Sequence, residues 1–276
     1  MRQLLPNRMP WSQANPTMGS LVVTPPTFRH LDDGRDRTPE RRLVIVQGYL
    51  TARPNPSADQ LAIRAIREAG WRGGIERFRW QAGHTGEIAM QLIPLAATAV
   101  LSPRPVTPLK ALQAARLAAL CGTFAAHWKW ACLRADWAGR RLAEAIERRR
   151  AEHPGEELQF VGFSLGCRVL YRAMHRLACQ SSPTIEQVHL FGGAHSRRAD
   201  WETALQTVRG GISNYYSAND RVLNYLYRMM EWNTPMGLKP IITEDLRIEN
   251  VDTATTFPGH HRYEESLHTW LNLRDG

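Results

Sequence analysis

Apolar residues along this chain follow two spacings in turn, and this pattern predicts a layered α/β fold. Short apolar or alternating runs, typical of buried strands, are followed by segments with apolar residues every three or four positions, typical of helices. The predicted strands are 42–46, 75–80, 158–163, 185–191, 212–217 and 246–251. The predicted helices are 58–69, 124–150, 165–179, 198–209, 221–231 and 261–271. Such alternation favours right-handed βαβ units and a mostly parallel central sheet flanked by helices.

Two segments depart from this pattern. Residues 1–40 are rich in Pro, Arg, Asp and Thr, and we interpret them as an N-terminal arm with loops and an edge strand at 21–23. Residues 41–276 form the predicted α/β domain, which carries a helical cap insert at about 86–123.

The insert begins with a nearly all-apolar stretch, 88–101, and resumes a helical pattern at 111–120. A helix over the first stretch would be about 21 Å long, short of the ~30 Å hydrocarbon core of a bilayer. Pro94 would also kink it. A spanning helix is therefore disfavoured. Two interpretations stay open: a pair of helices packed on the sheet, or a mobile cap over a pocket whose apolar face contacts a membrane.

The most informative motif is Gly162-Phe163-Ser164-Leu165-Gly166, which lies between a predicted strand and a predicted helix. In that context G-x-S-x-G predicts a nucleophile elbow, a cramped turn that exposes a serine hydroxyl. The two glycines are needed where helix and strand nearly touch. The bland alternative is an ordinary Gly-Ser turn.

A serine on such an elbow requires an acid after a later strand and then a histidine nearer the C-terminus. Asp220 follows the predicted strand 212–217, and His260 follows the last predicted strand. A neutral imidazole can take the serine proton, and a carboxylate orients the imidazole. Ser164, Asp220 and His260 therefore form the expected catalytic triad.

Both partners of the serine have rivals. Asp220 precedes an apolar-periodic run and could cap a helix, which is compatible with catalysis. Asp252 is the rival acid, although it lies beyond the last predicted strand. For the base, His260 competes with its neighbour His261 and, more distantly, with His195 and His268.

The remaining candidates surround the serine. The backbone N–H of Leu165, with one from Tyr49 or Leu50 after the strand 42–46, is expected to form the oxyanion hole. We expect Gly48, Phe163, His195 and His261 to line the pocket. No metal or organic cofactor is implied by these residues.

These motifs together resemble the poorly characterised α/β-hydrolase family typified by transmembrane and coiled-coil domain-containing protein four. The matching segments appear in family order within about residues 43–271: 46–50, 134–139, 161–169, 189–194, 216–223 and 259–263. The resemblance implies an α/β-hydrolase fold and favours His260 over His261, because the family has a Gly-His pair with a Tyr three residues after the His. One departure places His195 where the family has Pro. The family's substrates are not well established.

Composition narrows the functional classes. The chain has 276 residues, 43% hydrophobic and 22% charged, as expected for a soluble protein with one sizeable core. Its net charge is +9, carried mostly by arginine. No nucleic-acid-binding motif accompanies the charge, so no nucleic-acid partner is expected. The basic run Arg148-Arg149-Arg150 complements a helix dipole or contacts anionic lipid headgroups.

Cysteine spacing and the N-terminus indicate the compartment. Cys121, Cys132, Cys167 and Cys179 show no C-x-x-C spacing, which fits buried reduced thiols. The first residues lack the apolar core and cleavage site of a signal peptide. A cytoplasmic location, peripheral to a membrane if the cap contacts lipid, is therefore expected.

The sequence thus predicts a serine hydrolase of the esterase or lipase type that cleaves carboxylic esters or thioesters, lipid or other acyl esters among them, through an acyl-enzyme. The alternative is a non-catalytic membrane-docking or protein-interaction module with the same fold. Oligomeric state and substrate identity are not encoded in these patterns.

Overall fold

A computed structural model of the chain describes residues 25–32, 41–48, 56–81, 108–178, 184–256 and 259–271. Its core is a seven-stranded sheet in the order β1-β3-β2-β4-β5-β6-β7. The strands are β1 (Thr27–Asp32), β2 (Arg41–Val46), β3 (Gly74–Arg79), β4 (Glu157–Phe163), β5 (Ile185–Phe191), β6 (Val208–Tyr216) and β7 (Ile248–Asp252). β1 pairs antiparallel with β3, and the other neighbouring pairs are parallel. The predicted mostly parallel sheet is confirmed.

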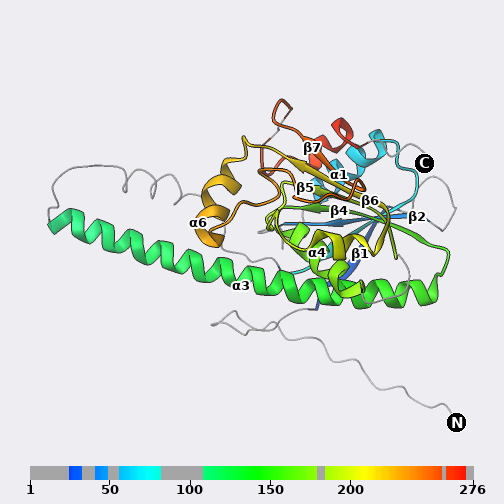
Figure 1. Cartoon of the computed structure of the whole chain (residues 1–276), viewed down its shortest axis with the longest axis horizontal. Coiled ribbons are helices and arrows are strands. Elements are labelled where there is room, and N and C mark those ends of the chain that lie inside the picture. The colour runs from blue at the N-terminus through cyan, green and yellow to red at the C-terminus, as the bar shows by residue number, and fades with distance from the viewer. Residues whose placement is uncertain are drawn as a thin grey trace, which may run out of the picture.

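Helices cover both faces of this sheet. They are α1 (Pro56–Glu68), α3 (Pro108–Glu152), α4 (Leu165–Leu177), α5 (Trp201–Leu205) and α6 (Arg228–Glu231). A π-helical turn, η1 (Leu223–Tyr227), precedes α6, and a 3-10 helix, η2 (Glu264–Thr269), lies near the C-terminus. Figure 1 shows α3 running along the same side of the sheet as α4, with α1 on the opposite side.

Side chains on β2 show why both faces must be covered. Val44 and Val46 belong to one buried apolar cluster, together with residues of α3 and α4. Leu43 and Ile45 belong to a second cluster, together with residues of α1 and η2. A strand that is apolar on both faces suits a parallel sheet between two helical layers.

The longest helix corrects the predicted boundary of the cap. Residues 108–123, predicted as part of a separate insert, are continuous with the predicted helix 124–150 in the 45-residue α3. After Pro108 this stretch contains no proline, and an internal glycine such as Gly122 costs only about 1 kcal/mol in a helix. The N-terminal half of α3 extends beyond the sheet (Figure 1). Residues 86–107 of the predicted cap lie outside the described residues.

Helix α3 is fastened to α4 by close packing and by ion pairs. A Cβ added at Gly139 would lie 2.5 Å from the Cβ of Arg172, so the two helices nearly touch there. The carboxylate of Asp136 accepts hydrogen bonds from Arg168 at 2.8 Å and from Arg172 at 2.9 Å. The face of α3 that packs on the core is buried at Trp128, Cys132, Ala135, Leu142 and Ile146.

Several other predicted boundaries shift. The edge strand is β1, at 27–32; the predicted strand 21–23 lies outside the described residues. The predicted helix 198–209 shortens to α5, because β6 already begins at Val208. The predicted helix 261–271 contains the 3-10 helix η2.

Not every arginine of the run Arg148-Arg149-Arg150, at the end of α3, faces solvent. Arg149 donates to Glu76 on β3 at 3.0 Å and to Glu156 at 2.9 Å, which ties the end of α3 to the sheet. These acceptors raise the pKa of the Arg149 guanidinium, outweighing the opposite effect of burial. Arg149 is therefore a structural cation rather than a lipid contact.

Candidate active site

Ser164 lies on a strained turn between β4 and α4. Its φ of +50° and ψ of −118° are a combination that non-glycine residues rarely adopt. A Cβ at Gly162 would lie 2.6 Å from Leu170 Cδ1, and one at Gly166 would lie 2.2 Å from the carbonyl oxygen of Val46. Both glycines are thus required by close approach, as the motif predicts.

The structure brings the three predicted triad residues together. The Nε2 atom of His260 lies 2.9 Å from Ser164 Oγ, and its Nδ1 lies 2.6 Å from Asp220 Oδ2. With a proton on Nδ1, the imidazole donates to the carboxylate and accepts from the serine hydroxyl. The Asp220 side chain is completely buried and that of His260 is 6% exposed, so bulk water competes little with these hydrogen bonds.

Asp220 makes the contacts expected of a triad acid and of a helix N-cap, one through each carboxylate oxygen. While Oδ2 faces His260, Oδ1 accepts a hydrogen bond from the backbone N–H of Leu223 at 3.0 Å. This is the bond expected of a helix N-cap. Capping holds the carboxylate still and so orients the imidazole more firmly.

The loop that carries His260 is held by Tyr263, three residues further on. A Cβ at Gly192, whose φ is +52°, would lie 2.7 Å from the Tyr263 ring and 3.5 Å from Asp220 Oδ2. Gly192 follows β5, Asp220 follows β6 and His260 follows β7. The site therefore lies at the carboxyl edge of the parallel strands, where open α/β sheets bind ligands.

The rival residues have other partners. Asp252, the last residue of β7, accepts a hydrogen bond from the N–H of Ala254 at 2.9 Å in an exposed turn. His268 lies 3.6 Å from Glu68 on the surface. The His261 ring is perpendicular to that of His260, with 5.3 Å between centroids. Partial burial, with a smaller contribution from His260, lowers the pKa of His261.

Only part of the expected oxyanion hole falls among the described residues. Leu165 is the first residue of α4, where backbone N–H groups have no intrahelical acceptor and the helix dipole favours negative charge. Tyr49 and Leu50 lie outside the described residues. Their neighbour Gly48 is close to the nucleophile, since a Cβ there would lie 2.8 Å from Ser164 Cβ and 3.4 Å from Ser164 Oγ.

Two predicted pocket residues pack into the interior. The Phe163 ring stacks on Phe191 with centroids 5.6 Å apart. The His195 ring lies 4.2 Å from the Tyr171 ring and 5.9 Å from Trp201, centroid to centroid. Neither ring nitrogen of His195 has a hydrogen-bond partner among the described residues. Both side chains therefore contribute to packing, and the prediction that they line the pocket stays untested.

Acid should destabilise this fold through two buried histidines. Burial lowers the pKa of His189 to about 4 and that of His195 to about 3, both below the ordinary 6.5. The unfolded chain therefore binds protons more readily, so stability is complete above pH 6.5 and falls as the pH drops toward 4. We expect a loss of about 1 kcal/mol per pH unit per histidine, measured by urea unfolding at pH 7.5 and 5.5. His195→Phe should lessen this pH dependence; an unchanged slope would contradict the assignment.

A charge network beside the triad was not found from the sequence. The guanidinium of Arg77 on β3 is fully buried and donates to Glu264 at 3.1 Å and 3.3 Å. The side-chain amide of Gln47 donates to the same carboxylate at 3.2 Å. The sequence feature that could have revealed this network is the charged pair Glu76-Arg77 in the middle of a predicted strand. Both residues are buried in the structure. Adjacent residues of a strand point to opposite faces of the sheet, so this pair places one buried charge on each face.

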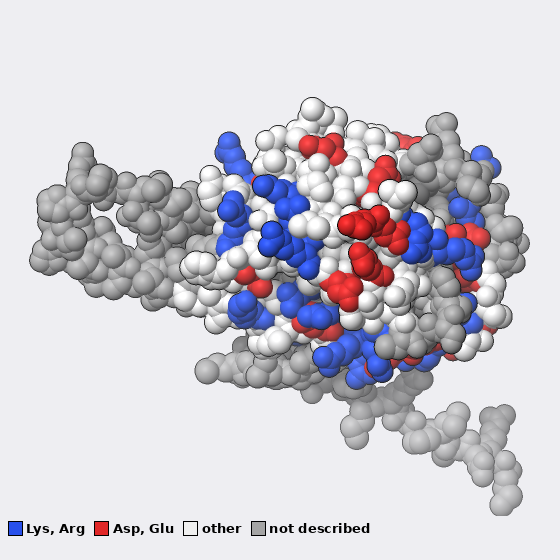
Figure 2. Space-filling model, viewed as in Figure 1, with Lys and Arg blue, Asp and Glu red and all other residues white. Residues whose placement is uncertain are grey.

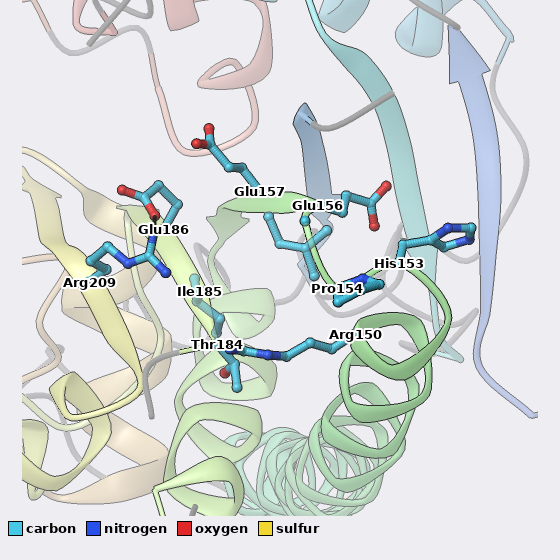
Figure 3. A pocket seen from close by; sticks show the side chains of 11 residues that line it. Arg150, His153, Pro154, Glu156, Glu157, Thr184, Ile185, Glu186 and Arg209 are labelled. Atoms are coloured by element: carbon cyan, nitrogen blue, oxygen red, sulfur yellow. Dashed lines mark ion pairs between the residues drawn. The ribbon is translucent and has the colours of Figure 1, made fainter. Parts of the chain in front are cut away.

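A pocket at the opposite edge of the sheet is separate from the triad. Its volume is about 220 Å³, and its walls come from the start of β4, the start of β5 and the end of α3. Figure 3 shows Arg150, His153, Glu157, Glu186 and Arg209 around it. Arg209 pairs with Glu186 at 3.2 Å, so charges of both signs compensate one another here. Within the described part of the chain, no group of His, Cys, Asp or Glu side chains has a metal-site arrangement.

The fold is similar to that of solved serine hydrolases. An α/β serine hydrolase without lid from Xanthomonas campestris is 14% identical, covers 92% of this chain and 94% of its own, and has a TM-score of 0.43. A serine hydrolase homologue from Coxiella burnetii is 10% identical, with 92% and 93% covered and a TM-score of 0.44. The seven-stranded sheet with helices on both faces, together with the strand–elbow–helix around Ser164, is an α/β-hydrolase fold.

Curated relatives are larger proteins. A transmembrane and coiled-coil domain-containing protein of Oryza sativa subsp. japonica is 30% identical over 70% of this chain and 31% of its own length. An uncharacterized membrane protein of Caenorhabditis elegans is 29% identical over 52% of this chain and 24% of its own. The chain thus matches about a third or less of these relatives. None of the helices in the described ranges is long and apolar enough to cross a membrane.

The match to a family model extends beyond the triad motifs. It covers residues 84–274, which include Ser164, Asp220 and His260. By this match, the chain belongs to the family described as protein of unknown function DUF726.

Proposed function

We propose that this chain is a serine hydrolase that cleaves carboxylic esters or thioesters through an acyl-enzyme. The observation that carries the proposal is the continuous hydrogen-bond chain from Asp220 Oδ2 through His260 to Ser164 Oγ, at 2.6 Å and 2.9 Å. This is the hydrogen-bond reach required of a nucleophile, its base and the group that orients the base. The α/β-hydrolase fold supports the same conclusion by analogy.

The reaction would proceed in two halves. Ser164 Oγ attacks the substrate carbonyl carbon while its proton passes to His260 Nε2. The imidazolium, stabilised by Asp220, then gives this proton to the leaving alcohol or thiol as the carbonyl–heteroatom bond breaks. In the second half a water loses its proton to His260, attacks the acyl carbon and releases the acid, and the proton returns to Ser164.

Negative charge on the carbonyl oxygen would be held at the start of α4. The N–H of Leu165 and one from Tyr49 or Leu50 are the proposed donors, and losing one such donor typically costs about 3 kcal/mol of transition-state stabilisation. The helix dipole of α4 favours the same charge.

We propose further that the substrate is presented at an anionic membrane surface. Three large side chains near the junction of α3 and α6 are exposed: Trp232 at 92%, Leu133 at 66% and Tyr225 at 55%. Lys129 and Arg228 are exposed beside them, and Figure 2 shows Lys and Arg side chains gathered on the part of the surface that carries α6. Aromatic rings and cations together suit an interface with anionic lipid. The relatives' names, one with the word transmembrane and the other with the words membrane protein, point the same way.

Binding to lipid should depend on these exposed side chains. Trp232→Ser combined with Leu133→Ser should weaken binding to vesicles that contain phosphatidylserine, with turnover of soluble short-chain esters unchanged. Binding should also weaken as salt rises through physiological strength, because exposed charges are screened beyond ~8 Å. Co-sedimentation with vesicles measures both effects. Leu246→Ser, at a side chain 97% exposed on a different loop, is the matched control. Equal binding by all variants would contradict the proposed surface.

The proposed reaction is tested with p-nitrophenyl esters and acyl thioesters of graded chain length. We expect hydrolysis of these substrates with an initial burst of alcohol or thiol, because an acyl-enzyme accumulates when its hydrolysis is slower than its formation. The length that gives the highest kcat/KM would identify the acyl class. Folded protein that cleaves none of the series, in solution or in vesicles, would contradict the proposal.

A further inference from the structure

Two separate loops of the candidate site meet at one carboxylate. Glu264 begins η2, four residues after His260, and its side chain is 19% exposed. Its Oε1 accepts from the Gln47 amide at 3.2 Å, and Gln47 directly precedes Gly48, which approaches Ser164. The loop that carries His260 and the segment Gln47-Gly48 beside Ser164 are therefore joined through Glu264.

Glu264 is itself fixed by a buried cation. Arg77 makes a two-pronged contact with both carboxylate oxygens, at 3.1 Å and 3.3 Å, and its Nε lies 2.8 Å from Asp59 Oδ1 on α1. Asp59 also accepts a hydrogen bond from Arg29 on β1 at 2.9 Å. A two-pronged arginine–carboxylate pair fixes orientation as well as distance. The carboxylate that joins the loops is thus anchored to the sheet and to α1.

The backbone of Gln47 is fixed from the other side. Its carbonyl oxygen accepts from the Trp80 indole N–H at 2.9 Å, and a Cβ at Gly166 would lie 2.7 Å from the same oxygen. Gln47 is therefore pressed against the first turn of α4, directly after the nucleophile. A change in its side-chain contact would be transmitted to the geometry around Ser164 and Leu165.

We propose that Gln47 and Glu264 are positioning residues, which hold Gly48 and the His260 loop in register with Ser164. This inference rests on the proposed hydrolase function. It assigns these residues no contact with substrate: they act through Gly48 on one side and through His260 on the other. Displacements of about 1 Å in such loops can cost about 100-fold in rate.

The central test is Gln47→Met, which removes the amide donor without leaving a buried charge unpaired. We expect kcat on a soluble ester to fall about 10-fold or more, with KM within about 2-fold, because chemistry rather than binding is disturbed. Gln206→Met is the matched control, since Gln206 is exposed at the end of α5, at the opposite edge of the sheet. Its kinetics should equal those of the wild type.

A double-mutant cycle separates positioning from general damage. Glu264→Gln keeps an acceptor oxygen and should lose less activity than Glu264→Met, while Gln47→Met and Glu264→Met together should be no worse than Glu264→Met alone. Hydrogen exchange adds a readout that does not need turnover: Gln47→Met should speed amide exchange in residues 259–264. Arg77→Lys is informative only on folded protein, because loss of a buried partner can unfold the chain.

The outcomes distinguish this inference from the proposed function. Turnover by the wild type together with unchanged kcat in Gln47→Met, or additive effects in the cycle, would overturn the positioning role alone. Unchanged exchange in residues 259–264 would overturn the link between the loops, with or without turnover. A folded wild-type chain that cleaves no ester contradicts the proposed function instead.

Discussion

Ser164→Ala should abolish turnover and leave the fold intact. The hydroxyl supplies both the proposed attacking oxygen and the 2.9 Å contact with His260 Nε2, whereas the backbone at the elbow is set by Gly162, Gly166 and the first turn of α4. We expect kcat for a cleavable ester to fall about 10³-fold or more, as when one member of other triads is removed. Steady-state kinetics at saturating ester measure this loss.

Two controls accompany Ser164→Ala: the stability of the variant, and a substitution at Cys167 in the same turn. The free energy of unfolding of Ser164→Ala, measured with urea, should match that of the wild type within about 0.5 kcal/mol, because the change removes one oxygen from the turn. Cys167→Ser alters a buried thiol that donates to the Phe191 carbonyl oxygen, so it should preserve most of the activity. Esterase activity in Ser164→Ala comparable to the wild type would refute the assignment of Ser164.

His260→Ala should be as damaging as the serine change, and His261→Ala should be mild. His260 bridges Ser164 and Asp220, while the His261 ring stands perpendicular to that of His260, with 5.3 Å between centroids. Among the described residues, no side chain other than His260 accepts a hydrogen bond from the Ser164 hydroxyl. We expect kcat to fall about 10³-fold or more for His260→Ala and by less than about 5-fold for His261→Ala.

The double variant tests whether the residues act as one unit. Ser164→Ala with His260→Ala should be no slower than either single variant, because a triad loses its function when one member is lost. If His261→Ala is the inactive variant, the roles are exchanged and the loop assignment is wrong by one residue.

The sequence was sufficient where local patterns and chain order carry the information. The short apolar run at 158–161 and the helical periodicity that follows the motif place Ser164 between a strand and a helix, and the order of acid and base follows from the fold. Because parallel strands end at the same edge, Asp220 and His260 could be expected beside Ser164 before any contact was known.

What could not be predicted depends on tertiary contacts. The pattern along 75–80 predicts a strand but no partner for Arg77, which is fully buried and paired with Glu264, 187 residues away in the chain. His195 follows β5 and reads as a rim residue, yet Tyr171 and Trp201 enclose its ring. The sequence did not reveal that residues 108–123 belong to α3, because helical periodicity alone does not show whether two neighbouring helical segments are continuous.

The central claim is that Ser164 is an activated nucleophile, and covalent labelling tests it most directly. A fluorophosphonate probe reacts with a serine whose proton is held by a base and whose oxyanion is stabilised, so it does not depend on the choice of substrate. We predict stoichiometric labelling of folded wild-type protein, an adduct mapped by mass spectrometry to Ser164, and no labelling of Ser164→Ala or His260→Ala. Folded wild-type protein that stays unlabelled, or an adduct on another residue, would contradict the account and favour a non-catalytic module with the hydrolase fold.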